Sequence, residues 1–310
     1  MPSHRARLVS RYLRWTFKPI DISEMDPAEL RALVEKRTPP LWPKGVEREE
    51  ITSPVTGEWQ RPDNARPGAT IYYLHGGGYV FGSPRTHRSL TYALSRAAAA
   101  PVFSLDYRLA PEHPCPAAIE DALAGWDWLL STGLKPEEIV VGGDSAGGGL
   151  TLALLQALKQ RGGALPAGAF LYSPWTDLAA TGDAIRENAE SDPMFQADKL
   201  YNGGRHYAGA LERTDPRVSP LYGSFVGLPK TFIFVSGTEI LRDDSVRAVE
   251  KMKAAGVDVE FVLQDGLPHV WPIFRPLMPE SQRTIETTAA FIRSVVKTDP
   301  ARAQLETAAA

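Results

Sequence analysis

Short apolar segments alternate with longer amphipathic segments along most of this chain. The apolar segments predict strands at 70–74, 102–106, 139–143, 169–173, 231–236 and 257–263, and those at 70–74 and 102–106 are typical of strands buried on both faces. Segments with helical periodicity lie between or after them, at 84–100, 116–130, 146–161, 244–255 and 280–296. This alternation predicts right-handed crossovers and a mostly parallel central sheet with helices on both faces, which is an α/β fold.

Two regions depart from this alternation. Residues 1–45 are polar and helical, with a helix start at Asp26 and Pro27, and residues 180–225 are rich in Gly, Pro, Asp and Tyr. We expect both regions to form a helical cap over a catalytic domain. The expected boundaries are 1–45 and an insertion at 180–225 for the cap, 46–299 for the catalytic domain, and 300–310 for a disordered tail.

The first 18 residues contain five basic residues and no acidic residue. Because these charges interrupt the apolar positions, the segment does not resemble a secretory signal peptide. No stretch of the chain approaches the ~18 consecutive apolar residues of a membrane span. Leu8, Tyr12 and Trp15 are spaced to share one helical face. A helix packed on its own protein is the favoured interpretation, a membrane-surface anchor is the alternative, and no stable membrane insertion is expected.

Composition narrows the class of protein further. A formal net charge of -3 gives no reason to expect nucleic acid as a partner. The single cysteine, Cys115, cannot form an internal disulfide, so we expect a cytoplasmic protein. Cys115 lies between Pro114 and Pro116, away from any predicted helix start, which favours a packed small side chain over a nucleophile.

The strongest chemical signal is Gly143-Asp144-Ser145-Ala146-Gly147, between a predicted strand and a predicted helix. A serine in such a turn exposes its hydroxyl at the carboxyl end of the sheet, and flanking glycines avoid clashes in so tight a bend. A phosphate loop is disfavoured because no lysine follows, and a dinucleotide loop because the strand comes late in the fold. Ser145 is therefore the expected nucleophile.

A glycine-rich loop, His75-Gly76-Gly77-Gly78, directly follows the first apolar strand. Glycines allow the backbone to turn its N–H groups inward, where two of them, with the N–H of Ala146, would stabilise the oxyanion of a tetrahedral intermediate. A merely flexible turn is the alternative.

A serine nucleophile needs a base, and one of the six histidines is well placed. His269 follows the last predicted strand, whereas the others lie in the basic segment, the glycine loop, a helix start, a proline-rich loop and the expected cap. The orienting acid should follow the preceding strand, which leaves Glu239, Asp243 and Asp244. Glu239 is nearest the strand end and is favoured, Asp243 is second, and both aspartates suit helix capping.

These motifs resemble the hormone-sensitive-lipase-like family, the bacterial family IV esterases of the α/β-hydrolase superfamily. The resemblance runs from about residue 70 to residue 295 in the family's order. It includes HGGGYVFGS (75–83), DYRLAPEHPCPAAIEDA (106–122), GDSAGG (143–148), SPWTDL (173–178), DPRVSPLYG (215–223), TEILRDD (238–244) and the His269 loop. It implies an α/β-hydrolase fold with a two-part cap and cofactor-free hydrolysis of short- to medium-chain carboxylic esters.

The resemblance also assigns roles to residues. It implies a triad of Ser145, Glu239 and His269, and an oxyanion hole of Gly76, Gly77 and Ala146. The family more often has aspartate in a DPL motif at the acid position, and an aromatic residue at Cys115, which we expect to affect packing only. Asp106 and Arg108 are expected to brace the oxyanion loop. A homodimer through the last edge strand is also implied.

The expected reaction is two-step acyl transfer on a small-molecule ester, with a neutral imidazole as base, so kcat/KM should fall at acid pH. Aromatic residues in or beside the catalytic loops are expected to wall a small acyl pocket, with plain core or cap packing as the alternative. They are Tyr79, Phe81, Trp271 and Phe274, with Tyr12 and Trp15 from the cap. A lactone, amide or acetyl-group hydrolase remains an alternative, and a non-catalytic ligand-binding receptor is a remote one.

Overall fold

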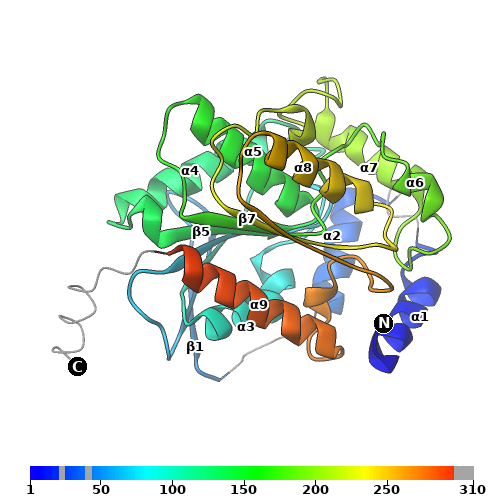
Figure 1. Cartoon of the computed structure of the whole chain (residues 1–310), viewed down its shortest axis with the longest axis horizontal. Coiled ribbons are helices and arrows are strands. Elements are labelled where there is room, and N and C mark those ends of the chain that lie inside the picture. The colour runs from blue at the N-terminus through cyan, green and yellow to red at the C-terminus, as the bar shows by residue number, and fades with distance from the viewer. Residues whose placement is uncertain (21–24, 39–43, 297–310) are drawn as a thin grey trace.

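The computed structural model describes residues 1–20, 25–38 and 44–296, with only the backbone at 198, 199, 201 and 202, and they form one sheet between two layers of helices (Figure 1). The sheet has eight strands in the order β1-β2-β4-β3-β5-β6-β7-β8. The strands are β1 (Val46–Ile51), β2 (Gly57–Pro62), β3 (Thr70–Leu74), β4 (Val102–Leu105), β5 (Ile139–Asp144), β6 (Gly168–Tyr172), β7 (Thr231–Ser236) and β8 (Val259–Gln264). Within the described residues, β2 is antiparallel to its neighbours β1 and β4 and all other neighbouring strands are parallel, so the predicted mostly parallel α/β fold is confirmed.

Helices cover both faces of this sheet. The helices of the described chain are α1 (His4–Thr16), α2 (Pro27–Arg37), α3 (Pro84–Ala98), α4 (Ala117–Ser131), α5 (Ala146–Gln160), α6 (Ala184–Glu187), α7 (Ala197–Ala208), α8 (Arg242–Ala254) and α9 (Pro279–Val295), with short 3-10 turns at Pro136–Glu138, Pro220–Tyr222 and Trp271–Phe274. Helices α3 and α9 pack on one face, and α4, α5 and α8 on the other (Figure 1). The central strands are therefore buried on both faces; every residue of β3 and β5 is buried.

Local sequence signals explain where several helices begin. The side chain of Asp26 accepts from the N–H groups of Ala28 and Glu29, and Pro27 occupies the first turn of α2, as the sequence predicted. Ser83 and Thr86 form a reciprocal capping box at the start of α3. The chain therefore leaves the glycine loop and enters α3 at a defined point.

The N-terminal segment and the insertion at 180–225 contact each other. Arg14 donates to the carbonyls of Glu190 and Ser191, and the ring of Phe17 lies 6.2 Å from that of Phe195. No described helix has the length and apolar character needed to cross a bilayer. The tail expected at 300–310 lies outside the described residues.

Candidate active site

Ser145 occupies a strained turn between β5 and α5. Its φ of 53° lies in the left-handed region, which is uncommon for a residue with a side chain, and its N–H donates to Tyr172 O at 2.9 Å. The flanking glycines are required by close backbone approaches: a Cβ on Gly143 would lie 2.4 Å from Gly147 O, and one on Gly147 would lie 2.0 Å from Leu74 O. Residues 143 and 147 must be glycine because a side chain at either position would collide with the neighbouring backbone in this turn.

A cavity of about 440 Å³ lies above the carboxyl ends of the central strands, and Ser145 and His269 both line it. Ser145 is 9% exposed and His269 is 3% exposed. His269 Nε2 is buried and has no hydrogen-bond partner within the described part of the chain. The expected nucleophile and base therefore open into the same enclosed space.

The carboxylate of Glu239 contacts the ring of His269. Its side chain is fully buried, and its Oε2 contacts Nδ1 of His269. Its Oε1 accepts hydrogen bonds from Ser173 Oγ at 2.8 Å and from the Ser236 N–H at 2.6 Å. A carboxylate on Nδ1 favours the tautomer whose proton is on that atom, and this leaves Nε2 as an acceptor.

The two aspartates that competed for the acid position belong to other networks. Asp243 Oδ2 accepts from the N–H of Ala184 at 2.8 Å, and its Oδ1 pairs with Arg242. Asp244 Oδ2 accepts from the N–H groups of Thr176 and Asp177, each at 2.7 Å. Burial, with a smaller effect of the nearby Asp177 charge, raises the pKa of Asp244 well above its usual value. Among the three candidates, the structure brings Glu239 to the histidine.

One of the two amides expected from the glycine loop does not face the cavity. The N–H of Gly76 donates to Asp144 Oδ1 at 3.0 Å, so it is not free to bind an oxyanion, which corrects the assignment of that residue. Gly77 and Gly78 line the cavity, and their N–H groups have no partner among the residues that the structure describes. Both have positive φ, and a Cβ on Gly77 would lie 2.0 Å from Phe81 O. Ala146 begins α5, where first-turn N–H groups lack intrahelical acceptors.

Two buried side chains, His87 and Asp144, support the glycine loop, because Asp144 binds both His87 and the N–H of Gly76. His87 Nε2 lies 3.4 Å from Asp144 Oδ2, and Tyr73 donates to Asp144 Oδ1 at 2.6 Å. Burial lowers the pKa of His87, but the Asp144 charge and hydrogen bonds outweigh it, so that the pKa is raised. The same contacts lower the pKa of Asp144 against the effect of burial. Burial and the neighbouring His87 lower the pKa of His75 to about 3, so this ring is neutral at ordinary pH.

The DYRLAPE loop does contact the glycine loop, but not through the expected side chains. Tyr107 donates to His75 O at 2.7 Å and its ring stacks on the His75 ring, with centroids 4.3 Å apart. Asp106 and Arg108 are exposed, and Arg108 binds Asp121 in α4, so the expectation that these two residues brace the loop is wrong. Charged side chains remain hydrated at the surface, whereas the tyrosine fits the buried position.

Three further residues escaped the sequence analysis. Ser173 binds Glu239, His87 lines the cavity and contacts Asp144, and Arg31 of α2 donates to the carbonyls of Val80 and Ala110, each at 2.8 Å. Only Ser173 carried a usable signal, because it directly follows β6 at the edge of the sheet where the candidate catalytic residues lie. The contacts of His87 and Arg31 join segments far apart in sequence.

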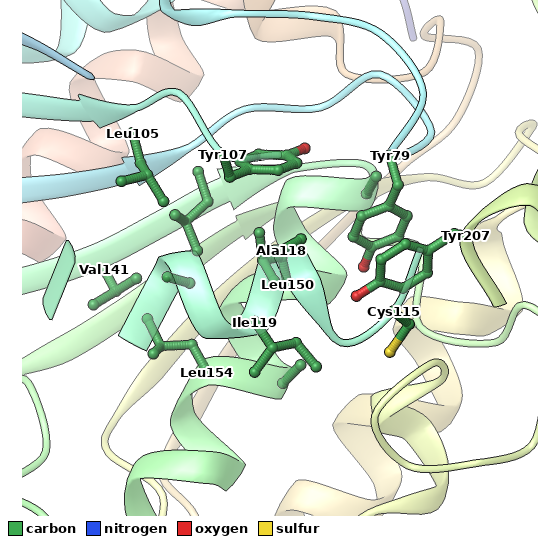
Figure 2. Packing of buried hydrophobic residues seen from close by; sticks show 14 of the residues in the cluster. Tyr79, Leu105, Tyr107, Cys115, Ala118, Ile119, Val141, Leu150, Leu154 and Tyr207 are labelled. Atoms are coloured by element: carbon green, nitrogen blue, oxygen red, sulfur yellow. The ribbon is translucent and has the colours of Figure 1, made fainter. Parts of the chain in front are cut away.

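The aromatic residues divide into two groups. Phe81 and Phe274 line the cavity, whereas Tyr79 stacks on Tyr207 with ring centroids 3.6 Å apart (Figure 2), and Trp271 Nε1 donates to Thr284 Oγ1 at 2.8 Å. Tyr79 and Trp271 are both 1% exposed and are absent from the cavity lining, so for them the alternative of core packing holds.

The two aromatic residues expected from the cap also miss the cavity. Tyr12 is 66% exposed and Trp15 is 74% exposed, which corrects the expectation that they wall the pocket. Leu13 and Phe17 line it instead, because they lie on or beside the opposite face of α1. Helical spacing predicted that Leu8, Tyr12 and Trp15 share a face, but not which way that face points.

Cys115 packs beneath the Tyr79 and Tyr207 pair (Figure 2). Its side chain is buried, its N–H donates to Tyr207 O at 2.7 Å, and burial raises the pKa of its thiol to about 11. The structure therefore agrees with a packed small side chain and not with a nucleophile.

We expect the native protein to resist thiol-specific reagents. At pH 8, about one Cys115 thiol in a thousand is ionised when its pKa is near 11, and burial hinders access further. Titration with an aromatic disulfide reagent should detect no reactive thiol in native protein and one after denaturation. The variant Tyr12→Cys, at an exposed position, should add one fast-reacting thiol, and rapid reaction of the unmodified chain would contradict the prediction.

Comparison with known proteins agrees with this geometry. A family model described as the α/β-hydrolase fold matches residues 71–273. An acetyl-hydrolase of Streptomyces hygroscopicus is 41% identical over 77% of this chain and 80% of that protein, and the carboxylesterase/phospholipase LipF of Mycobacterium tuberculosis is 35% identical over 94% of this chain and 82% of that protein. The crystal structure of EstE5 superposes with a TM-score of 0.90 at 38% identity, over 94% of this chain and 98% of that one. An esterase of the bacterial hormone-sensitive lipase family superposes with a TM-score of 0.87 at 38% identity, over 94% of this chain and 97% of that one. This chain thus belongs to the hormone-sensitive-lipase-like family of the α/β-hydrolase superfamily.

Proposed function

We propose that this protein is a serine carboxylesterase that hydrolyses short- to medium-chain esters of small molecules through Ser145, His269 and Glu239. The observation that carries the proposal is the buried contact of Glu239 with Nδ1 of His269, whose unpartnered Nε2 shares a cavity with Ser145. The names of its relatives, which include esterases and a carboxylic ester hydrolase, support the reaction class.

In the proposed reaction these groups act in sequence. His269 Nε2 accepts the proton of Ser145 as Oγ attacks the ester carbonyl, and the N–H groups of Gly77, Gly78 and Ala146 bind the oxygen on which negative charge develops. The imidazolium, stabilised by the Glu239 carboxylate, then protonates the leaving alkoxide. Water attacks the acyl-enzyme with the same base and releases the acid.

The acyl group would occupy the apolar part of the cavity. Leu13 and Phe17 from α1, and Leu30 and Val34 from α2, line it. A volume of about 440 Å³ is in the lower half of the range for small-molecule sites. Apolar walls favour an acyl chain of several methylenes, while the limited volume disfavours a long one.

Hydrolysis of a series of p-nitrophenyl esters from acetate to palmitate tests both the reaction and the chain length. We expect kcat/KM to be highest between butyrate and octanoate and to be at least ~10-fold lower for palmitate, whose chain cannot be enclosed. Absence of ester hydrolysis would overturn the proposed function, whereas equal rates for butyrate and palmitate would overturn only the chain-length assignment.

A pair of matched variants locates the acyl site. Val34→Trp places a large ring in the cavity wall and should move the optimum towards acetate, whereas Val226→Trp, at a position 63% exposed, should leave the profile unchanged. If Val34→Trp leaves the profile unchanged, the acyl chain does not occupy the side of the cavity formed by α2.

Similarity to a named acetyl-hydrolase favours one second candidate, removal of acetyl groups. A rate that is highest for acetate and falls steadily with every longer ester would favour that activity. Lactone and anilide substrates in the same panel test the remaining acyl-transfer alternatives, which use the same groups on Ser145.

A further inference from the structure

Helix α1 carries an apolar face that the rest of the described chain leaves exposed. Leu8, Tyr12 and Trp15, at spacings of four and three residues, are 66%, 66% and 74% exposed. The inward face packs through Ala6 and Leu13, which are 0% and 7% exposed. Packing within this chain therefore explains why the inward face of α1 is apolar, but not why the outward face is. A cluster of exposed apolar residues indicates a binding surface.

Basic side chains accompany these apolar residues on α1. Arg5, Arg7 and Arg11 are exposed, and no ion pair or side-chain hydrogen bond engages them among the residues described. Arg14, by contrast, binds backbone carbonyls at 190 and 191. A helix with Leu, Tyr and Trp on one face and arginines beside them matches the composition of helices that lie in a membrane interface, where aromatic rings prefer the headgroup level.

We propose that the outward face of α1 binds the surface of an anionic lipid bilayer, with the helix parallel to the membrane plane and no part of the chain crossing it. This outer α1 patch consists of Leu8, Tyr12, Trp15, Arg5, Arg7 and Arg11.

Charge favours lipid over a second copy of the chain as the occupant of this patch. A two-fold dimer through α1 would place the arginines of both helices in one interface with no acidic residue on either helix, and such a concentration of like charge opposes association. Anionic headgroups neutralise the same arginines, while the interface takes up the rings of Tyr12 and Trp15.

The attachment of α1 makes this patch an anchor for the whole protein. The N-cap residue Ser3 donates from its N–H and its hydroxyl to Glu280 of α9, at 2.6 and 3.0 Å. Arg14 fixes the other end of the helix, which lies at the periphery of the molecule (Figure 1). Because Leu13 lines the cavity from the opposite face and a helix is ~10 Å thick, bound lipid would lie about one helix diameter from the cavity.

Co-sedimentation with vesicles tests the proposal without reference to activity. The chain, and equally its Ser145→Ala variant, should bind vesicles of phosphatidylcholine and phosphatidylglycerol in equal parts, but not vesicles of phosphatidylcholine alone. Binding should weaken strongly between ~0.15 M and ~1 M salt. Because the readout is sedimentation, failure here would leave the proposed esterase activity untouched, and failure of that activity would leave this result untouched.

Substitutions in the patch separate its two components. Arg5→Gln/Arg7→Gln/Arg11→Gln should lower the vesicle partition coefficient ~100-fold, and Leu8→Ser/Tyr12→Ser/Trp15→Ser at least ~10-fold. Matched controls at exposed positions elsewhere should bind as the unmodified chain does. These are Lys44→Gln/Arg66→Gln/Lys253→Gln and Val226→Ser/Leu277→Ser. Unchanged circular dichroism and thermal unfolding show that each variant is folded.

A fluorescent probe reports the depth of the helix. Because Cys115 is buried, Tyr12→Cys offers a single accessible thiol for an environment-sensitive dye, whose emission should rise and shift to the blue with anionic vesicles only. The proposal is overturned if the unmodified chain does not bind anionic vesicles, or if the patch variants bind as the controls do. It is also overturned if the patch substitutions instead dissolve a dimer seen by sedimentation velocity, since a second copy would then cover the face.

Discussion

Ser145→Ala is expected to lower kcat for p-nitrophenyl butyrate about a million-fold, to a residual rate that binding and the oxyanion amides alone provide. Without the hydroxyl, His269 has no nucleophile to deprotonate and no acyl-enzyme forms. The variant should also lose covalent labelling by a fluorophosphonate, which the unmodified chain should show with one adduct per molecule. Ser224→Ala, at an exposed serine outside the cavity lining, is the matched control and should retain full activity and labelling.

The triad should also behave as one unit. The double variant Ser145→Ala/His269→Ala should be no slower than either single variant, because each removal already abolishes the same step. Retention of more than about a hundredth of the activity by Ser145→Ala would show that another group is the nucleophile. Failure of the unmodified chain to react with fluorophosphonate would favour the remote alternative of a ligand-binding receptor.

Glu239→Gln is expected to lower kcat about 10⁴-fold while the fold persists. A glutamine amide can donate to Nδ1, which stabilises the tautomer with the proton on Nε2, and that tautomer cannot accept the proton of Ser145. The loss should extend across the whole pH profile, because the tautomer is wrong at every pH at which the ring is neutral. Circular dichroism and thermal unfolding should show a folded protein.

Two variants control for loss of a carboxylate. Asp243→Asn removes the charge that competed for this role, and it should leave kcat near its normal value because Asp243 binds Ala184 and Arg242 instead. Glu239→Asp should restore part of the activity, since an acceptor remains. If Asp243→Asn costs as much activity as Glu239→Gln, the orienting acid is misassigned.

The strand–turn–helix around Ser145 could be predicted because every requirement is local. Two glycines must flank the serine within a few residues, an apolar strand must precede it and a helix must follow it. All of these features lie close together in the sequence. The alternation of strands and helices is equally local, and with the rule of right-handed crossover it predicts the sheet and the edge at which the catalytic loops meet.

The orienting acid could be narrowed to a short list but not assigned from spacing alone. Three carboxylates follow β7 within six residues of one another. The structure selects between them through partners distant in sequence, because Ser173 holds Glu239 whereas Ala184 and Thr176 occupy the two aspartates. A hydrogen bond between segments 60 or more residues apart cannot be predicted from the periodicity of the sequence.

The chain by itself determined the α/β class, the turn at Ser145 and the family, since these depend on residues adjacent in sequence. Only the tertiary structure decided that the N–H of Gly76 binds Asp144, that Tyr79 packs in the core, and that Trp15 points away from the cavity. An amide can donate to a neighbour or face a cavity, and an aromatic ring can pack in the core, line a cavity or face solvent, without any difference in the local sequence. Which of these positions an amide or a ring takes depends on the residues that the rest of the fold brings next to it.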